Sequence, residues 1–142
     1  SVGAAALGFA EIALDMGISR ATTRPMFGAM LSDLQMTQGA IGDMCTEIDA
    51  ATLLIYRAAW ERDVLQRRTT KSAAMAKMFA TEAAQRVIDR CVQILGGQGV
   101  TGETIVMRIF MDMRGFRIYD GPSEVHRWSM ARKIIDGLGK TA

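Results

Sequence analysis

The sequence predicts an all-α fold, an up-and-down four-helix bundle with one short additional helix. Helix-favouring alanine, methionine and leucine are abundant, whereas proline occurs only at Pro25 and Pro122, so long helices are permitted almost everywhere and strands are poorly supported. Apolar residues also recur at the three- and four-residue spacing of amphipathic helices. With 142 residues and 49% hydrophobic content, the chain has the length of one domain, residues 1–142, and enough apolar side chains for a sizeable core.

The first predicted helix covers residues 4–23, where apolar side chains repeat at helical spacing. Pro25 marks its end, because the residue before a proline is disfavoured in helical backbone. Residues 24–33 are expected to form a turn-rich connector without long periodic structure. A second and longer helix is predicted over residues 36–67, again from one continuous apolar stripe.

A third helix is predicted over residues 71–95, with its stop at Gly96 and Gly97. Because only a short turn separates it from the preceding helix, the two should pack antiparallel. A shorter helix follows over residues 104–113, and the last helix covers residues 122–136. The sequence contains no internal repeat and no linker that would divide these elements.

Charge, cysteine content and hydropathy exclude several classes of function. Seventeen Lys and Arg residues against fifteen Asp and Glu give a net charge of +2, and the basic residues are spread out, so nucleic acid binding is not indicated. Cys45 and Cys91 fall on apolar stripes, which indicates buried free thiols and neither a disulfide nor a metal site. No apolar run approaches the ~20 residues needed to span a bilayer, so no membrane insertion is expected. The uncapped helical pattern at Ser1 favours a piece of a longer chain.

The candidate for chemistry is Asp120, within the segment of residues 117–127 that runs from a loop into the last predicted helix. Gly121 is expected at the N-cap, Pro122 at the first helical position, and Glu124 in the first turn. The Asp120 carboxylate would then lie just outside a helix N-terminus, where free N–H groups and the helix dipole favour its ionised form. The residue is therefore either a proton acceptor or a helix-capping side chain.

Three further features have simpler explanations. Residues 97–102 fit the pattern G-x-G-x-x-G, but they follow a predicted helix, whereas a dinucleotide fingerprint follows a strand. A glycine-rich helix stop that lets backbone approach a ligand is the preferred interpretation. His126 is interpreted as a structural residue and not as a general base. Arg24, taken alone, reads as a solvated connector residue.

Three segments occur together in a specific order. The first is Arg24-Pro-Met-Phe27-Gly28, followed by Gln35; the second is Gln93-Ile-Leu-Gly-Gly-Gln-Gly99; the third is Tyr119-Asp-Gly-Pro-Ser-Glu-Val125. In this combination, residues 3–135 resemble the C-terminal helical domain of the acyl-CoA dehydrogenases. The resemblance implies a flavoenzyme that oxidises an acyl-CoA thioester to the 2,3-enoyl-CoA, with FAD taking the hydride.

The resemblance also assigns roles to residues. Asp120 would be the catalytic base that removes the proton alpha to the thioester carbonyl, and Gly121 would lie against the acyl-CoA substrate. Arg24 would contact the FAD pyrophosphate, and Ser123 with Glu124 would lie near the FAD of their own subunit. The FAD of a neighbouring subunit would be bordered by Gln35 and by the backbone of Gln93, Ile94, Leu95, Gly96 and Gly97. The implied partners are an electron-transfer protein acceptor and further copies of the chain, as a dimer or tetramer. The compartment would be cytoplasmic in a bacterium, and mitochondrial or peroxisomal in a eukaryote.

Departures from the family pattern leave alternatives open. Asp120 replaces the usual glutamate, Pro122 replaces the usual threonine, and Met111 replaces an arginine. The Asp-Gly-Pro-x-Glu-Val-His combination is similar to a branch whose dehydrogenase part is fused to a phosphotransferase-like domain. An oxidase of the nitroalkane-oxidase or acyl-CoA-oxidase kind would use the same base and flavin but pass electrons to oxygen. A noncatalytic helical oligomerisation module is the other alternative, because the family's amino-terminal helical and β domains are not in this sequence.

Overall fold

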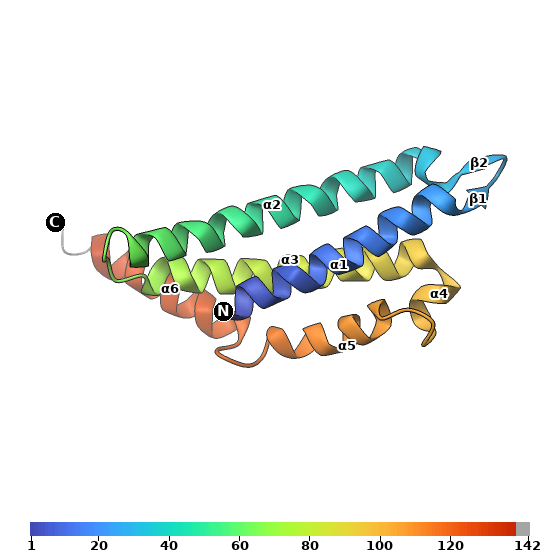
Figure 1. Ribbon diagram of the computed structural model, residues 1–142. Helices are drawn as coiled ribbons and strands as arrows, with labels where there is room; N and C mark the ends of the chain where they lie inside the picture. The colour runs from blue at the N-terminus through green and yellow to red at the C-terminus, as the bar shows by residue number, and fades with distance from the viewer. Residues whose placement is uncertain (139–142) are drawn as a thin grey trace.

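The computed structural model describes residues 1–138, and it confirms the all-α class (Figure 1). The α-helices of this part of the chain are α1 (Val2–Thr23), α2 (Gln35–Asp63), α3 (Thr70–Leu95), α4 (Gly97–Val100), α5 (Val106–Phe116) and α6 (Ser123–Leu138). Between α1 and α2 lie two short strands, β1 (Pro25–Met26) and β2 (Ala29–Met30), and a 3₁₀ helix, η1 (Leu31–Asp33).

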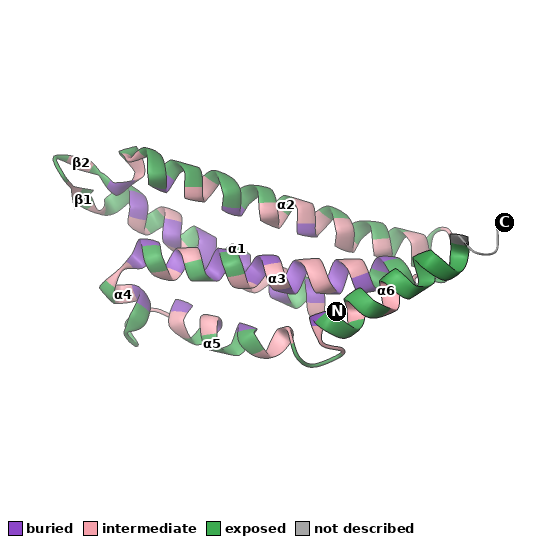
Figure 2. Ribbon diagram, turned by 180° about the vertical axis from the view of Figure 1, so that it is seen from behind, coloured by how far each residue is buried: buried purple, intermediate pink, exposed green. Residues whose placement is uncertain are grey.

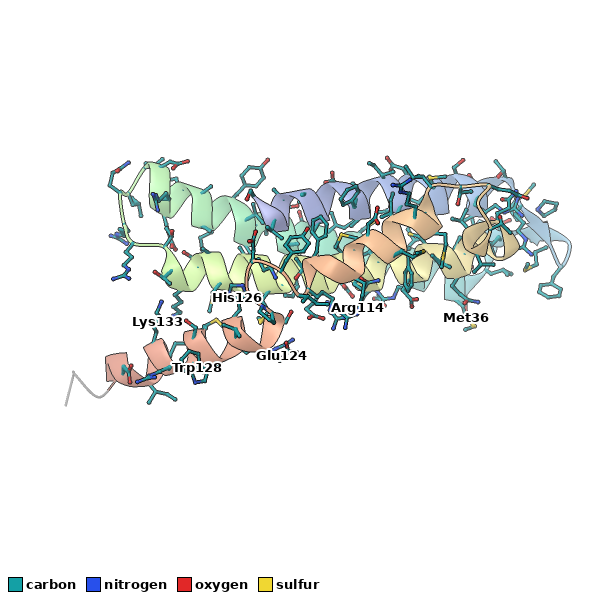
Figure 3. All side chains as sticks on the ribbon, turned by 90° about the horizontal axis from the view of Figure 1, so that it is seen from below. Met36, Arg114, Glu124, His126, Trp128 and Lys133 are labelled. Atoms are coloured by element: carbon teal, nitrogen blue, oxygen red, sulfur yellow. The ribbon has the colours of Figure 1, made fainter. Side chains whose placement is uncertain are left out.

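Helices α1, α2, α3 and α5 alternate in direction and form the up-and-down bundle (Figure 1). Helix α3 is central, since it packs against α1, α2, α5 and α6. The short α5 is the fourth member of the bundle because its apolar face, formed by Val106, Ile109 and Met113, is buried. Helix α6 is the appended helix, and it diverges from the bundle toward its C-terminal end (Figure 3).

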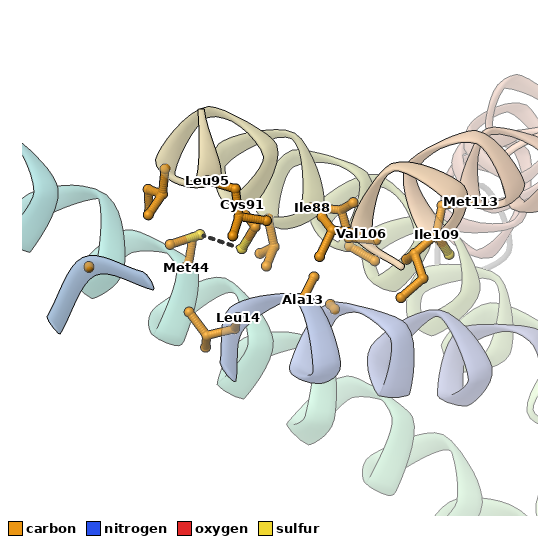
Figure 4. Packing of buried hydrophobic residues seen from close by; sticks show 14 of the residues in the cluster. Ala13, Leu14, Met44, Ile88, Cys91, Leu95, Val106, Ile109 and Met113 are labelled. Atoms are coloured by element: carbon orange, nitrogen blue, oxygen red, sulfur yellow. Dashed lines mark hydrogen bonds between the residues drawn. The ribbon is translucent and has the colours of Figure 1, made fainter. Parts of the chain in front are cut away.

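The core follows the interface of α1 and α3, as the burial pattern in Figure 2 shows. Ala6, Ala10 and Ala13 of α1 are at most 1% exposed. Such small side chains let two helices approach at the short end of the usual range of about 8–10 Å between axes. Met44 of α2 and Ile88 of α3 are fully buried and fill the space beside this interface (Figure 4).

The connector after α1 contains a hairpin that the sequence analysis did not predict. Strands β1 and β2 pair antiparallel, with Pro25 opposite Met30 and Met26 opposite Ala29. The two residues between them, Phe27 and Gly28, both have positive φ, 54° and 81°, as a tight hairpin turn requires. Phe27 stands where such a turn usually has asparagine or aspartate. The sequence therefore carries no Asn-Gly or Asp-Gly pair from which the hairpin could be predicted.

The two cysteines differ in environment. Cys91 is buried, as predicted, and burial raises its pKa to about 12. Its Sγ lies 3.6 Å from the Met44 sulfur (Figure 4). The prediction for Cys45 was wrong, because this thiol is exposed. Adjacent residues on a helix point about 100° apart, so Met44 faces the core and the next residue, Cys45, does not.

Helix α1 is long and apolar enough to cross a membrane by length and composition, with 22 residues and a window of mean hydropathy 1.4. The expectation that no run approaches this length was therefore wrong. In the bundle α1 packs against α2, α3 and α5, and 33% of that window is buried. The core helix of a folded bundle meets the same criteria.

Candidate functional site

The Asp120 segment forms a closed loop between α5 and α6. The Ser123 N–H donates to the Arg117 carbonyl at 3.3 Å and joins the two ends of the loop. Inside it, Asp120 and Gly121 have φ angles of 51° and 94°. Aspartate is one of the few residues other than glycine that adopt this left-handed conformation readily, and glycine has no Cβ to oppose it. The turn geometry therefore explains the Asp-Gly pair.

Two side chains of α3 hold this loop against the bundle. Lys77, only 9% exposed, donates from Nζ to the Gly121 carbonyl at 2.8 Å. The Glu82 carboxylate accepts a hydrogen bond from the Ser123 hydroxyl at 2.6 Å. It also pairs with the Arg117 guanidinium at 2.9 Å. The loop is thus anchored at both ends by Glu82 and near its middle by Lys77.

Sequence reasoning missed both anchors. Lys77 and Gly121 are 44 residues apart in the chain, and their contact has no local signature. One available signal was a lysine inside an alanine-rich stretch of a buried helix, since a lysine there must find a partner. Burial alone would raise the pKa of the Glu82 carboxyl, but the hydrogen bonds from Ser123 and Arg117 lower it below its ordinary value.

Helix α6 begins one residue later than predicted. The Pro122 carbonyl accepts the His126 N–H at 3.1 Å, so Pro122 occupies the N-cap position and Ser123 is the first helical residue. Gly121, expected at the N-cap, lies outside the helix. Glu124 is in the first turn, as predicted. Asp120 therefore still precedes the N-terminus of a helix, but the helix starts one residue further along the chain than predicted.

His126 packs against the same loop. Its Nε2 lies 3.2 Å from the Asp120 carbonyl oxygen. A Cβ added at Gly121 would come within 2.8 Å of that nitrogen, so a side chain at position 121 would require the imidazole to move. Figure 3 shows His126 between α6 and the bundle, whereas Trp128 points away from it. This placement agrees with the interpretation of His126 as a structural residue.

A groove of ≈ 660 Å³ lies beside the loop, between the start of α1, the end of α2, the start of α3 and α6. Lys77 and His126, which contact the loop, belong to its lining. Small apolar side chains such as Ala58 and Ala73 form much of the remainder. The Asp120 side chain itself is exposed. The loop and the groove together form a candidate site with an exposed carboxylate next to an alanine-lined space.

The second group of candidate residues lies at the other end of α3. The Arg24 guanidinium covers Gly96, where an added Cβ would come within 3.0 Å of Nη1. Gly96 has a φ of 64° and its N–H donates to the carbonyls of Val92 and Gln93, which confirms the predicted helix stop. At Gly97, an added Cβ would meet nothing within 4 Å among residues 1–138 apart from the adjoining residues and the backbone of its own helix. Backbone at this end is therefore accessible beside a cationic side chain.

The remaining candidates of this group differ in what they expose. Gln35, the first residue of α2, and Gln93, near the end of α3, are both exposed. The side chains of Ile94 and Leu95 belong to the core, at 9% and 3% exposure. At these two positions only the backbone can border a ligand.

The structure does not bring the two groups of candidates together. Lys77, which marks the Asp120 loop, and Gly96 are separated by about 28 Å along the axis of α3. Asp120, Gly121 and Ser123 form one group, and Arg24 with Gly96 belongs to the other. Within residues 1–138, no three His, Cys, Asp or Glu side chains are grouped so that they could hold a metal ion.

Comparison with known proteins identifies the relatives of this fold. The family model described as acyl-CoA dehydrogenase, C-terminal domain, matches residues 1–135. The chain belongs to the acyl-CoA dehydrogenase family. Cyclohexane-1-carbonyl-CoA dehydrogenase of Geobacter metallireducens is 39% identical over 135 residues, which are 95% of this chain and 35% of that protein.

Solved structures agree with this family assignment. Butyryl-CoA dehydrogenase from Megasphaera elsdenii has a TM-score of 0.90 and 35% identity, over 94% of this chain and 35% of that one. An FAD complex of PigA has a TM-score of 0.89 and 26% identity, over 93% and 34% of the two chains. This acyl-CoA dehydrogenase domain thus spans about a third of the length of the relatives that it matches.

Proposed function

We propose that the chain is the C-terminal domain of an FAD-dependent acyl-CoA dehydrogenase and that it supplies Asp120 as the catalytic base. The anchored loop carries this proposal. Asp120 is held in a left-handed turn immediately before α6, and its neighbour Gly121 is fixed by Lys77. The N-terminus of a helix favours negative charge, which suits a carboxylate that must accept a proton.

The reaction assigns separate tasks to the residues of the loop. A carboxylate oxygen of Asp120 takes the proton alpha to the thioester carbonyl. Gly121 would lie against the thioester through its backbone, since the position of its missing side chain is taken by the His126 imidazole. Bound FAD supplies the acceptor for the hydride that leaves the beta carbon, so the acyl-CoA becomes the 2,3-enoyl-CoA. We assign the acyl chain to the alanine-lined groove next to Lys77 and His126.

The residues at the far end of α3 fit an FAD molecule. Arg24 presents a guanidinium, whose planar donors match phosphate oxygens. Gly97, whose Cβ position is open, allows backbone to approach the same anion. Gln35 and Gln93 expose amide groups that can donate to or accept from the nucleotide. The donor set is therefore appropriate for the diphosphate and its neighbouring groups.

The distance between the two groups supports assembly of several copies. Because about 28 Å of α3 separates them, we infer that each chain contributes Asp120 to one active site and the Gly96 end to the FAD of a neighbouring subunit. Leu53, Tyr56 and Trp60 are exposed along one side of α2, at 63%, 69% and 52%. An apolar stripe of this kind is typical of a protein interface and supports a homodimer or tetramer.

Replacing Arg24 is expected to weaken FAD binding. In the full-length parent protein, Arg24→Ala should raise the Kd for FAD roughly ten- to a hundredfold, since a charge-assisted contact contributes about 1.5–3 kcal/mol. Dialysis of the holoenzyme followed by fluorescence titration with FAD measures the change. Arg108→Ala, at a position 82% exposed on α5, is the matched control and should bind FAD as the wild type does. An unchanged Kd for Arg24→Ala would remove this residue from the site.

The proposed function is tested by mixing the FAD-loaded parent protein with acyl-CoA thioesters without oxygen. Loss of the flavin absorbance band is expected, with formation of the 2,3-enoyl-CoA. The isolated 142-residue chain should be helical by circular dichroism but purify without stoichiometric FAD, because the cofactor needs walls from the rest of the parent. A stable yellow complex of the isolated chain would contradict that expectation.

The same preparation distinguishes a dehydrogenase from an oxidase. We propose an electron-transfer protein as the acceptor. Reoxidation of the reduced enzyme should therefore be fast with such a protein and slow in air-saturated buffer. Stoichiometric hydrogen peroxide in air would instead identify an oxidase that uses the same carboxylate and flavin.

A further inference from the structure

We propose that Lys77 is a positioning residue for the catalytic base: its ammonium group donates to the Gly121 carbonyl and so fixes the left-handed Asp120-Gly121 turn that carries the base. The proposal rests on the function proposed above for Asp120. It goes further because it assigns a residue of another helix, far away in sequence, to the control of that base.

The first step of the argument is the burial of Lys77. Lysine is almost never fully buried without a partner, because removing an ammonium group from water is costly. Lys77 is 9% exposed and lies among alanines of α3, including Ala76 and Ala80. Burial lowers the pKa of Lys77, and the charges of Asp120 and Glu82 oppose that shift. The cost of burying this ammonium group is offset only by its contacts, and those contacts are with the Asp120 loop.

The second step is the direction of its hydrogen bond. Nζ of Lys77 donates to the carbonyl of Gly121 at 2.8 Å, and Gly121 directly follows Asp120 in the chain. Asp120 and Gly121 both have positive φ, a conformation from which an unsupported loop would readily flip to other backbone angles. Fixing this carbonyl from α3 therefore fixes the direction in which the Asp120 side chain leaves the backbone.

The third step is the balance of charge around the loop. The titratable and charged groups that face it from α3, from the loop and from α6 are Lys77, Glu82, Arg117, Tyr119, His126 and Arg127. Glu82 is already paired with Arg117 and hydrogen-bonded by Ser123. Lys77 is therefore the side chain of α3 that holds the Gly121 carbonyl, whereas Glu82 holds the two ends of the loop.

The test uses the FAD-loaded parent protein and compares two quantities, the rate of flavin reduction at saturating acyl-CoA and the affinity for acyl-CoA. Lys77→Met keeps an unbranched side chain but removes the charge and the donor. A loosened turn misplaces the Asp120 carboxylate, so we expect the rate of flavin reduction to fall about tenfold or more while the affinity for acyl-CoA stays within about twofold of the wild type.

Three further variants separate charge from folding. Lys77→Arg keeps a charged donor and should restore most of the wild-type rate of flavin reduction. Lys77→Gln keeps a neutral donor on a shorter side chain, and it should reduce its flavin more slowly than the wild type even if Lys77→Met fails to retain FAD. Lys71→Met removes an exposed lysine at the start of the same helix and should leave both the rate and the affinity unchanged. Circular dichroism and FAD content confirm that each protein is folded.

The outcomes are distinct from those that test the proposed function. If Asp120→Asn is slow and the uncharged Lys77 variants reduce their flavin as fast as the wild type, the assignment of Lys77 is wrong. Weaker binding of FAD or acyl-CoA with an unchanged rate of reduction at saturating substrate also overturns it, since that result describes a structural lysine. If Asp120→Asn reduces its flavin as fast as the wild type, the role of Asp120 fails, and the role of Lys77 fails with it.

Discussion

Asp120→Asn is expected to slow flavin reduction by acyl-CoA at least about 10²-fold in the FAD-loaded parent protein, with substrate binding retained. Asparagine has the same shape as aspartate but lacks the basic carboxylate. It also tolerates left-handed backbone angles, so the turn with φ of 51° at this position should remain in place. Anaerobic stopped-flow absorbance gives the rate of reduction, and a spectral titration gives the affinity for acyl-CoA.

Asp120→Glu is the second variant of this experiment. Glutamate restores the usual residue of the family, but it adds a methylene and adopts positive φ less readily than aspartate. If the loop anchored by Lys77 and Glu82 is built around the shorter side chain, the carboxylate is displaced and the rate falls despite an intact base. Asp120→Asn with wild-type kinetics would show instead that Asp120 only shapes the start of α6.

The parts of the fold that could be predicted from the sequence are those fixed by local patterns. The periodicity of apolar side chains gave α1 and α3 to within two residues at each end, because each buries a continuous stripe. The end of α2 was placed four residues too late, at residue 67, although the helix ends at Asp63. Apolar and polar residues continue past that point without a proline or glycine to mark the stop.

The candidate site was predictable only in its sequence-local part. The helix start with Glu124 in its first turn follows from neighbouring residues, and the sequence indicated it to within one position. The left-handed turn at Asp120 and Gly121 was not predicted, since the sequence analysis expected Gly121 at the N-cap. Lys77 and Glu82 act on the loop across more than 40 residues, as their contacts with Gly121 and Ser123 show. Contacts of this kind depend on how α3 and α6 are packed, which periodicity alone does not specify.

The glycines of residues 97–102 illustrate the same limit. The sequence analysis interpreted them as backbone kept open for a ligand, and Gly97 fits that interpretation. Gly99 does not fit it, because the direction in which a side chain would point is blocked by the backbone of α3. A Cβ at Gly99 would lie 2.4 Å from the Val92 carbonyl oxygen and 3.0 Å from the Leu95 Cβ. Glycine is therefore required at this position for the packing of α4 against α3.

Gly99→Ala is accordingly expected to lower the free energy of unfolding of the 142-residue chain by about 3 kcal/mol, the upper end of the usual cost of overpacking. The Val92 carbonyl is backbone within α3 and cannot rotate aside, so relief requires α4 to move away. Gly97→Ala is the matched control, with an open Cβ position and no positive φ. It should leave stability unchanged or raise it by up to ~1 kcal/mol, since alanine reduces the entropy of the unfolded chain. Urea denaturation followed by circular dichroism at 222 nm, the standard helix band, compares the three proteins. Equal midpoints for Gly99→Ala and Gly97→Ala would mean that α4 is not held against Val92 in solution.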